Sequence, residues 1–118
     1  LLRGCFAHHP PRPERVRYRL EPDDPFAAAF GGEAAEMSFV DEHYFVRVDE
    51  ANTSIFLRSA SPDGESVAGW RHGCGSGRVV CLAPAHTLEG LADARLHRLL
   101  AAAVRWCADG EAGMSSSV

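Results

Sequence analysis

The sequence predicts an α/β domain in which short strands and a β-meander precede a C-terminal helix. Three observations support this fold class. Strand-like apolar runs recur between residues 16 and 83. A stripe of apolar residues at helical spacing lies at residues 96–107. An apolar strand at residues 79–83 is followed by Pro84 and then His86, and α/β folds gather ligand groups at such strand ends.

The first predicted elements are short. At residues 16–20 apolar side chains alternate with arginines, which indicates a strand with one face in water. Asp24 followed by Pro25 is typical of a helix start, with a capping side chain and a first-turn proline, and predicts a short helical turn. A further short strand is predicted around residues 37–39, and it leads into the polar stretch 41–44.

The middle of the chain predicts a β-meander. A strand at residues 54–59, a turn at 61–64 and a returning strand at 66–72 follow one another. The glycine-rich segment 73–77 invites comparison with a phosphate-binding loop. Phosphate-binding loops open a helix after a strand, whereas this segment stands between two predicted strands, so we interpret it as the loop of a hairpin with the strand at 79–83.

The last predicted element is a helix that packs on one face. Asp93 is placed to cap its start and Gly110 its end. The tail at residues 111–118 is small and polar and is predicted to be disordered, which leaves residues 1–110 as one domain. The predicted buried stripe consists of Leu96, Leu99, Leu100, Ala103, Val104 and Cys107.

Composition excludes several classes of partner. The 118 residues carry a net charge of −4, and the basic residues are scattered rather than gathered in a stripe, which argues against nucleic acid. No apolar run approaches the ~20 residues of a membrane span, so no membrane partner is predicted. The four cysteines have neither a C-x-x-C pair nor the spacing of a zinc knuckle. We interpret them as thiols in a reducing compartment, and the predicted localisation is cytoplasmic.

Several motifs follow one another in a recognisable order. They are Asp41-Glu42-x-Tyr44, a strand ending near Trp70, Gly75-x-Gly77-Arg78-Val79, His86, and a final helix carrying Ala103-Val104-Arg105-Trp106. In this order and spacing they resemble the C-terminal half of the trehalose-utilisation (ThuA-like) family, which belongs to the glutamine-amidotransferase-like superfamily. The resemblance covers the predicted domain at residues 1–110.

The resemblance implies a partial flavodoxin-like α/β fold, because the family's N-terminal half, with the first parallel strands and several site residues, is absent here. Such a fragment would need the missing half or self-association to cover its apolar faces. The sequence departs from the family at two positions. Ala85 stands where the family usually has glycine, and Ser76 stands where a lysine is common between the two glycines of the loop.

The candidate site residues are His86, Glu42, Tyr44 and Asp41. We predict His86 and Glu42 as catalytic residues and as candidate metal ligands, since an imidazole can act as a general base and either group can hold a metal. We predict Tyr44 and Asp41 as substrate-binding residues. A structural histidine remains the alternative for His86. The Cys-His-Glu triad of related amidotransferases is broken, because Leu88 occupies the position of the glutamate.

The function implied by the resemblance is carbohydrate metabolism, with trehalose or a related oxidised sugar as the small-molecule substrate. The chemistry would be acid–base catalysis on the sugar, with a divalent metal as a candidate cofactor. The family is enzymatic, whereas this portion alone is expected to be inactive, so enzymatic activity stays open. The alternative is a non-catalytic sugar-binding or interaction module within a larger polypeptide.

Overall fold

The computed structural model of the protein describes residues 1–30 and 35–110, which form seven strands and four helical segments. The tail predicted to be disordered at residues 111–118 lies outside the described residues. The strands are β1 (Gly4–His8), β2 (Glu14–Leu20), β3 (Glu36–Asp41), β4 (Phe45–Val48), β5 (Ser54–Ser61), β6 (Gly64–Cys74) and β7 (Gly77–Leu82). The helical segments are η1 (Pro25–Phe30), η2 (Glu50–Asn52), α1 (Leu88–Leu91) and α2 (Ala94–Asp109).

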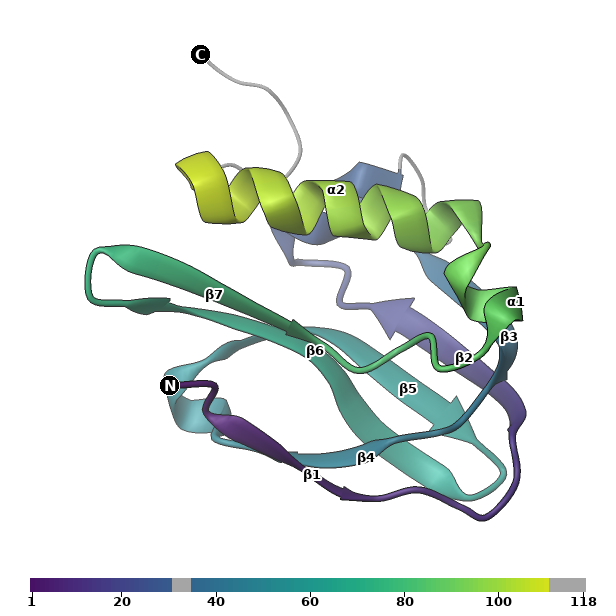
Figure 1. The fold of residues 1–118 in the computed structure, drawn as a ribbon. Coiled ribbons are helices and arrows are strands. Elements are labelled where there is room, and N and C mark those ends of the chain that lie inside the picture. Colours follow the sequence, from purple (N-terminus) through teal and green to yellow (C-terminus); the bar gives the residue numbers. More distant parts are fainter. Residues whose placement is uncertain (31–34, 111–118) are drawn as a thin grey trace.

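These strands form two antiparallel sheets (Figure 1). One is a five-stranded sheet in the order β3-β2-β5-β6-β7, and the other is the pair β1-β4. Every pairing among the described strands is antiparallel. The predicted flavodoxin-like α/β fold is therefore wrong, because that fold needs parallel strands joined by crossover helices of a dozen or more residues. Here the turns between β5, β6 and β7 are far too short for such crossovers.

The β-meander itself is present. The strands predicted at residues 54–59, 66–72 and 79–83 correspond to β5, β6 and β7, which pair in sequence order. The glycine-rich segment is a hairpin loop, in which Cys74 pairs with Gly77 and Gly75 adopts a φ of +59°. That conformation suits glycine, because it has no Cβ to clash in the left-handed region.

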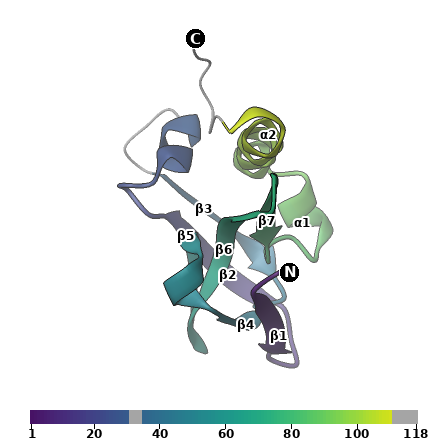
Figure 2. The same cartoon turned by 90° about the vertical axis from the view of Figure 1, so that its left-hand side faces the viewer.

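The core lies between the five-stranded sheet and the helices that cover one of its faces (Figure 2). Strand β2 shows why the sheet is two-sided, since its apolar residues are buried while its alternate arginines are exposed. Apolar residues from β2, β3, η1, β5, β6 and α2 meet there. They are Val16, Tyr18, Leu20, Phe26, Met37, Phe39, Phe56, Leu57, Ala68, Leu96, Leu99 and Ala102.

Helix α2 begins and ends where the sequence predicts. The Asp93 carboxylate accepts hydrogen bonds from the backbone N–H groups of Arg95 and Leu96, which have no partner within the helix. Gly110 closes the helix in the left-handed conformation, with φ at +79°, and its N–H donates to the Trp106 carbonyl.

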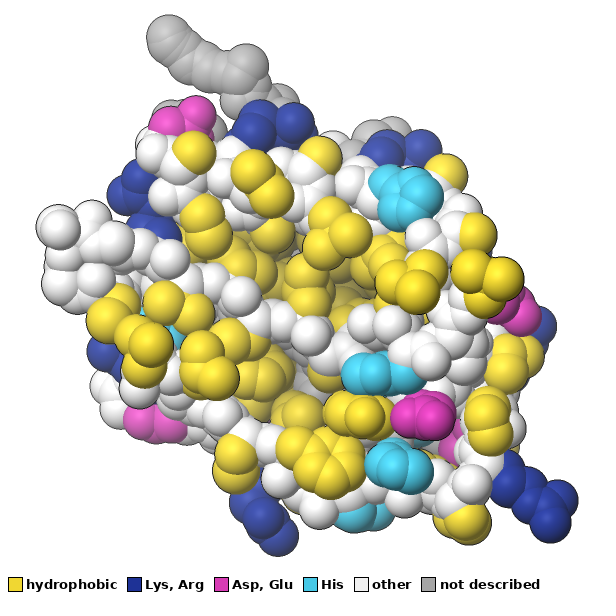
Figure 3. All heavy atoms as spheres, viewed as in Figure 1, with side chains coloured by type: hydrophobic (Ala, Val, Ile, Leu, Met, Phe, Trp, Pro, Cys, Tyr) yellow, Lys and Arg dark blue, Asp and Glu magenta, His cyan; other side chains and the backbone are white. Residues whose placement is uncertain are grey.

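The buried face of α2 is rotated relative to the prediction. Leu96, Leu99 and Ala103 are buried as expected. Leu100 and Val104 are 42% and 68% exposed and Cys107 is also exposed, so their predicted burial is wrong. They line a groove of about 470 Å³ with Val80 and Leu82 of β7, the last strand of the sheet. Figure 3 shows this apolar surface between the helix and the sheet edge.

The β1-β4 pair packs beside β6. The Val46 N–H donates to the Ser66 hydroxyl at 3.1 Å, and the Trp70 indole N–H donates to the Leu2 carbonyl at 2.8 Å. Gly4 lies so close to the Trp70 ring that a Cβ would come within 2.6 Å of it, which explains a glycine inside this strand. Among the described residues, no helix is long and apolar enough to cross a membrane.

Candidate functional site

The carboxylate of Asp41, at the end of β3, joins two loops that are far apart in sequence. Its Oδ1 atom accepts hydrogen bonds from the backbone N–H groups of Glu42, at 2.9 Å, and His86, at 2.7 Å. Its Oδ2 atom accepts from the Tyr18 hydroxyl, at 2.6 Å, and from the Ala85 N–H, at 2.7 Å. The Oδ1 atom therefore holds the backbones of both Glu42 and His86, the two residues predicted to be catalytic.

Asp41 is fully buried and its two oxygens accept four hydrogen bonds, so its carboxylate positions the loop at residues 85–86 instead of facing a ligand. This differs from its predicted role in substrate binding. Burial, together with the hydrogen bond to the neighbouring carboxylate, raises the pKa of Tyr18, so that its phenol stays protonated and remains a donor to Asp41.

The loop after β7 reaches His86 through a left-handed residue. Ala85 has a φ of +80°, a region that residues with a Cβ seldom adopt. This conformation turns the backbone so that the N–H groups of both Ala85 and His86 point at Asp41.

Tyr44 lies at the centre of a cluster of rings beside this loop. The His86 ring stacks on it, with the centroids 3.7 Å apart and the planes within 13°. The His9 ring is nearly parallel to it at 5.6 Å, and the Phe6 ring is tilted against it at 4.7 Å. His86 and His9 are exposed, and Phe6 is 51% exposed. Figure 3 shows histidine and hydrophobic side chains gathered around an acidic one on this face.

Each exposed imidazole of this cluster is fixed by a backbone carbonyl. The His86 Nε2 atom is 2.5 Å from the Ala83 oxygen, and the His9 Nδ1 atom is 2.6 Å from the Pro10 oxygen. A carbonyl can only accept, so these two nitrogens carry the hydrogen. The other nitrogen of His86, Nδ1, has no hydrogen-bond partner among the described residues and is free to accept from a ligand.

Glu42 is half-buried, and its side chain forms no hydrogen bond or ion pair with the part of the chain that the structure describes. With Tyr44 and His86 it forms what we call the His86 corner, comprising residues 42, 44 and 86. Three of the four predicted site residues thus come together there. Among residues 1–30 and 35–110, no group of three or more His, Cys, Asp or Glu side chains could hold a metal ion.

His43, which lies between two of the predicted site residues and is not itself among them, is fully buried. Its Nδ1 atom is 2.6 Å from the Ser61 hydroxyl oxygen and its Nε2 atom is 2.8 Å from that of Ser59. Its ring also contacts Phe45, at 4.3 Å between centroids. A sequence signal existed, because the alternation of buried residues that starts at Met37 continues through positions 39, 41 and 43.

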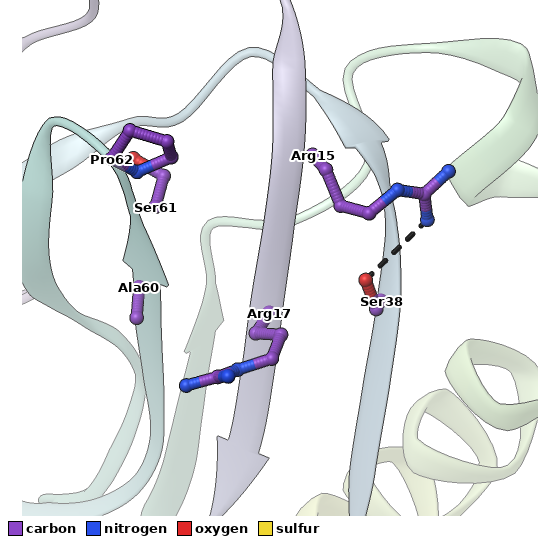
Figure 4. A pocket seen from close by; sticks show the side chains of 6 residues that line it. All are labelled: Arg15, Arg17, Ser38, Ala60, Ser61 and Pro62. Carbon is purple, nitrogen blue, oxygen red and sulfur yellow. Dashed lines mark hydrogen bonds between the residues drawn. The ribbon is translucent and has the colours of Figure 1, made fainter.

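A second hollow lies on the face of the sheet away from α2. It has a volume of about 380 Å³ and is lined by Arg15, Arg17, Ser38, Ala60, Ser61 and Pro62. Figure 4 shows Arg15 and Arg17 reaching to opposite sides of β2, so the two guanidinium groups do not converge on one ligand position. Each also lies beside a glutamate, Glu89 at 3.6 Å from Arg15 and Glu36 at 3.3 Å from Arg17. The His86 corner is therefore the stronger candidate.

Comparison with known proteins returned no matching family model, no matching curated protein and no matching solved structure. The assignment of function consequently depends on the geometry of the His86 corner and on the order of motifs in the sequence.

Proposed function

We propose that the His86 corner binds a small carbohydrate and that His86 acts on it as a general acid–base. The observation that carries this proposal is the exposed imidazole of His86, which is fixed through Nε2 and stacked on Tyr44 while Nδ1 stays free. A fixed imidazole with one free nitrogen is suited to exchange a proton with a bound hydroxyl or with a carbon next to a carbonyl.

The groups around His86 can supply the other interactions that a bound sugar makes, namely hydrogen bonds to its hydroxyl groups and contacts with its C–H groups. The Glu42 carboxylate is half-buried and unpaired among the described residues, and it can accept hydrogen bonds from sugar hydroxyls. The exposed faces of His86 and Phe6 offer flat surfaces for the C–H groups of a pyranose ring. The Tyr44 ring is partly covered by its three neighbours, so its hydroxyl is the part that it offers a ligand.

One local feature, the conformation of Ala85, favours the resemblance to the ThuA-like family, although the antiparallel sheet is not the flavodoxin-like fold which that resemblance implied. A family position that usually holds glycine is occupied here by a residue with φ at +80°, where glycine is favoured. Membership of the family, the carbohydrate class of the substrate and the small-molecule partner remain proposals that rest on this residue and on the order of the motifs.

A second candidate function is a non-catalytic sugar-binding module. The burial of Asp41 favours it, because only one carboxylate, that of Glu42, then accompanies His86 at the corner. Glycoside hydrolysis commonly uses two carboxyl groups that flank the scissile bond. The proposed chemistry is therefore proton transfer on a sugar rather than hydrolysis of a glycosidic bond.

The test is an NMR titration of the chain with trehalose, glucose and a keto-glucoside. We expect the resonances of His86 and Tyr44 to shift with sugar, and His86→Ala to abolish the shift. His97→Ala is the matched control, because His97 is also exposed and also bonds a backbone carbonyl, that of Leu91, through Nε2 at 2.6 Å. Binding that survives His86→Ala, or no shift in the native chain, would contradict the proposal.

Deuterium exchange separates the two candidate functions. If His86 transfers protons, the chain should catalyse exchange at the carbon next to the carbonyl of the keto-glucoside in D₂O, and His86→Ala should not. Sugar binding without exchange would assign the corner to a binding module.

A further inference from the structure

The two outer strands of the five-stranded sheet, β3 and β7, differ in what lies beside their outward edges. At the β3 edge, side chains from the segment around α1 and α2 bond the outward backbone groups. The Thr87 hydroxyl donates to the Val40 carbonyl at 2.6 Å, and the Val40 N–H donates to Oε2 of Glu89 at 3.3 Å. An Arg95 N–H donates to the Glu36 carbonyl at 3.4 Å. The β3 edge is therefore occupied by the chain itself, which keeps a further strand from pairing there.

The β7 edge has no such cover. The Ala83 N–H donates to the Ala68 carbonyl across the β6–β7 ladder, and hydrogen-bonded pairs alternate along an antiparallel ladder. The residues of β7 whose N–H and C=O groups point away from β6 are therefore Arg78, Val80 and Leu82. Among residues 1–30 and 35–110, none of these outward groups has a hydrogen-bond partner.

Strand β7 also lacks the features that usually keep other strands away from an edge. It contains no proline, and its pairing with β6 has no bulge. Its one charged side chain, Arg78, donates to the Trp106 carbonyl at 2.7 Å instead of guarding the edge. The groove between β7 and α2 is lined by valine, leucine, alanine and cysteine alone. Figure 1 shows β7 beside α2, and Figure 3 shows apolar side chains between them, so an apolar strand fits this edge.

We propose that the β7 edge pairs with the β7 edge of a second copy of this chain, antiparallel about a two-fold axis at Val80. Val80 then pairs with Val80 of the other copy, and Arg78 of each copy pairs with Leu82 of the other. Every outward N–H and C=O group of both strands gains a partner. The axis is perpendicular to the sheet, so both α2 helices stay on one side of it and the two grooves adjoin.

The sequence of β7 favours this register over its neighbours. A shift by two residues in one direction places Arg78 opposite Pro84 of the other copy, which has no N–H to donate. A shift in the other direction places Leu82 opposite Ser76, in the hairpin loop. In the proposed register the two Arg78 residues lie at opposite ends of the paired segment, roughly 13 Å apart along the strands. No like charges therefore face each other.

The symmetry of this contact explains why a second copy suits the edge better than a growing array. Once the two β7 strands pair, the outer strands of the joined sheet are the two β3 strands, whose edges are occupied by Thr87, Glu89 and Arg95. A contact between β7 and β3 of another copy would leave one free edge at each end and continue into a fibre. The same three side chains oppose it.

Each chain keeps its own core in this pair, unlike the self-association expected for an incomplete α/β fragment. The pair should therefore form and dissociate without unfolding. Below its dissociation constant the chain is a monomer, in which Leu100 is 42% exposed. The contact uses no residue of the His86 corner, so it is independent of the proposed sugar binding.

The first experiment is analytical ultracentrifugation of the chain from micromolar to millimolar concentration, beside hydrogen exchange. We expect a reversible equilibrium between monomer and dimer without larger species. The amides of Arg78, Val80 and Leu82 should become more protected as the dimer fills. A chain that stays monomeric at millimolar concentration, or that grows into larger species, would overturn the proposal.

Variants in the groove and at the edge locate the contact. Val104→Glu adds a carboxylate at a position 68% exposed in the monomer, so the monomer should fold while the dimer weakens at least about tenfold. Arg105→Gln is the control, because it lowers the net charge by the same amount at the next exposed position and should leave the dimer unchanged. A dimer that Val104→Glu leaves intact would overturn the proposal.

Proline substitutions test the backbone pairing itself. Val80→Pro removes one outward N–H while sparing the bonds between β6 and β7, and proline is tolerated on edge strands. Ser38→Pro is the matched control, since Ser38 likewise faces outward from β3 in its ladder with β2. We expect the dimer to be lost in the folded Val80 variant and kept in the folded Ser38 variant. The reverse pattern would overturn the proposal.

A disulfide tests the register. Residue 79 of one copy lies opposite Cys81 of the other in a non-hydrogen-bonded pair, where Cα atoms are about 4.5 Å apart and within disulfide reach. Val79→Cys, treated with oxidised glutathione, should give a covalent dimer in which mass spectrometry finds residue 79 linked to residue 81. Adding Cys81→Ser should abolish it. A dimer linked only through the exposed Cys5, Cys74 or Cys107, or no covalent dimer, would overturn the register.

Discussion

Beneath helix α2 the fold is held by apolar contact, whereas at the end of strand β3 it is held by one carboxylate. Under the helix, Leu96 and Leu99 pack against the aromatic rings of the sheet and exclude water. The resulting hydrophobic stabilisation has no preferred direction and grows with the buried apolar area. At Asp41, four donors from three segments converge on two oxygen atoms, and each bond fixes a direction as well as a distance.

The difference explains why the candidate site lies at the second region. Apolar packing tolerates small shifts, because side chains of similar volume can repack. A hydrogen-bonded carboxylate fixes the backbone of the residues it holds, so the loop at residues 85–86 has a defined position although its side chains are exposed. The comparison predicts that removing one group at Asp41 costs more than removing several methyl groups under the helix, and that changes to the exposed side chains of the corner cost little.

The largest expected effect is that of Asp41→Ala. The substitution leaves the Tyr18 hydroxyl and three backbone N–H groups without their acceptor, and each buried donor left unpaired is costly. We expect a loss of about 3–5 kcal/mol in the free energy of unfolding, measured by urea denaturation. Glu42→Ala is the control and should cost less than about 1 kcal/mol, because its side chain is half-buried and unpaired among the described residues. Equal effects of the two substitutions would show that Asp41 does not hold the loops.

The next effect is that of Leu99→Ala, at a residue with no exposed surface in the middle of α2. Removing a buried leucine side chain costs about 2–5 kcal/mol, depending on how far the cavity collapses. Leu100→Ala changes the neighbouring leucine by the same number of atoms, but this side chain is 42% exposed and should cost at most about 1 kcal/mol. The pair is measured by thermal or urea unfolding, and a larger cost at Leu100 would mean that the groove beside β7 is covered in solution.

These two leucines also mark the limit of what the sequence could predict. Helical periodicity is a local property, so the helix and both of its caps were predicted correctly from residues 93–110 alone. Which edge of the apolar stripe is buried depends on where the helix lies relative to the sheet. Here α2 lies near β7, the last strand of the sheet, and one side of its stripe extends past that strand.

The relative direction of the strands could not be predicted from the sequence, for a similar reason. The alternation along β2 predicts a two-sided strand, but it does not state which strands are its neighbours. The antiparallel arrangement depends on pairings between distant segments, such as Gly4 with Val48.

The candidate site was predicted in part. Glu42 and Tyr44 were chosen because the family resemblance carries these two residues, and His86 because it follows a buried strand. The structure brings the three together, and their roles stay predictions. The burial of Asp41 and His43 was not predicted, although both continue the alternation of inward-facing residues that begins at Met37. A polar residue can occupy an inward-facing position of a strand, as an apolar residue does, when hydrogen-bond partners are present in the interior.

A smaller effect of opposite sign is expected from Ala85→Gly. A residue with a Cβ is strained at a φ of +80°, so glycine should raise the free energy of unfolding by about 0.5–1 kcal/mol after its greater freedom in the unfolded chain is deducted. Ala101→Gly, at an exposed position within α2, is the control and should lower it by about 1 kcal/mol. Two losses of similar size would show that Ala85 is not held in the left-handed region.

The smallest effect on stability is expected from His86→Ala. The backbone N–H of His86, which bonds Asp41, is unchanged by the substitution, and the imidazole that is lost is exposed. Its stack on Tyr44 and its bond to the Ala83 carbonyl lie at the surface, where water replaces them at little cost. We expect a change within about 0.5 kcal/mol, as for His97→Ala measured beside it in the same unfolding experiment. A loss several times larger would make His86 a structural residue. It would also show that the loop at residues 85–86 depends on the His86 side chain for its fold, and not on the Asp41 carboxylate alone.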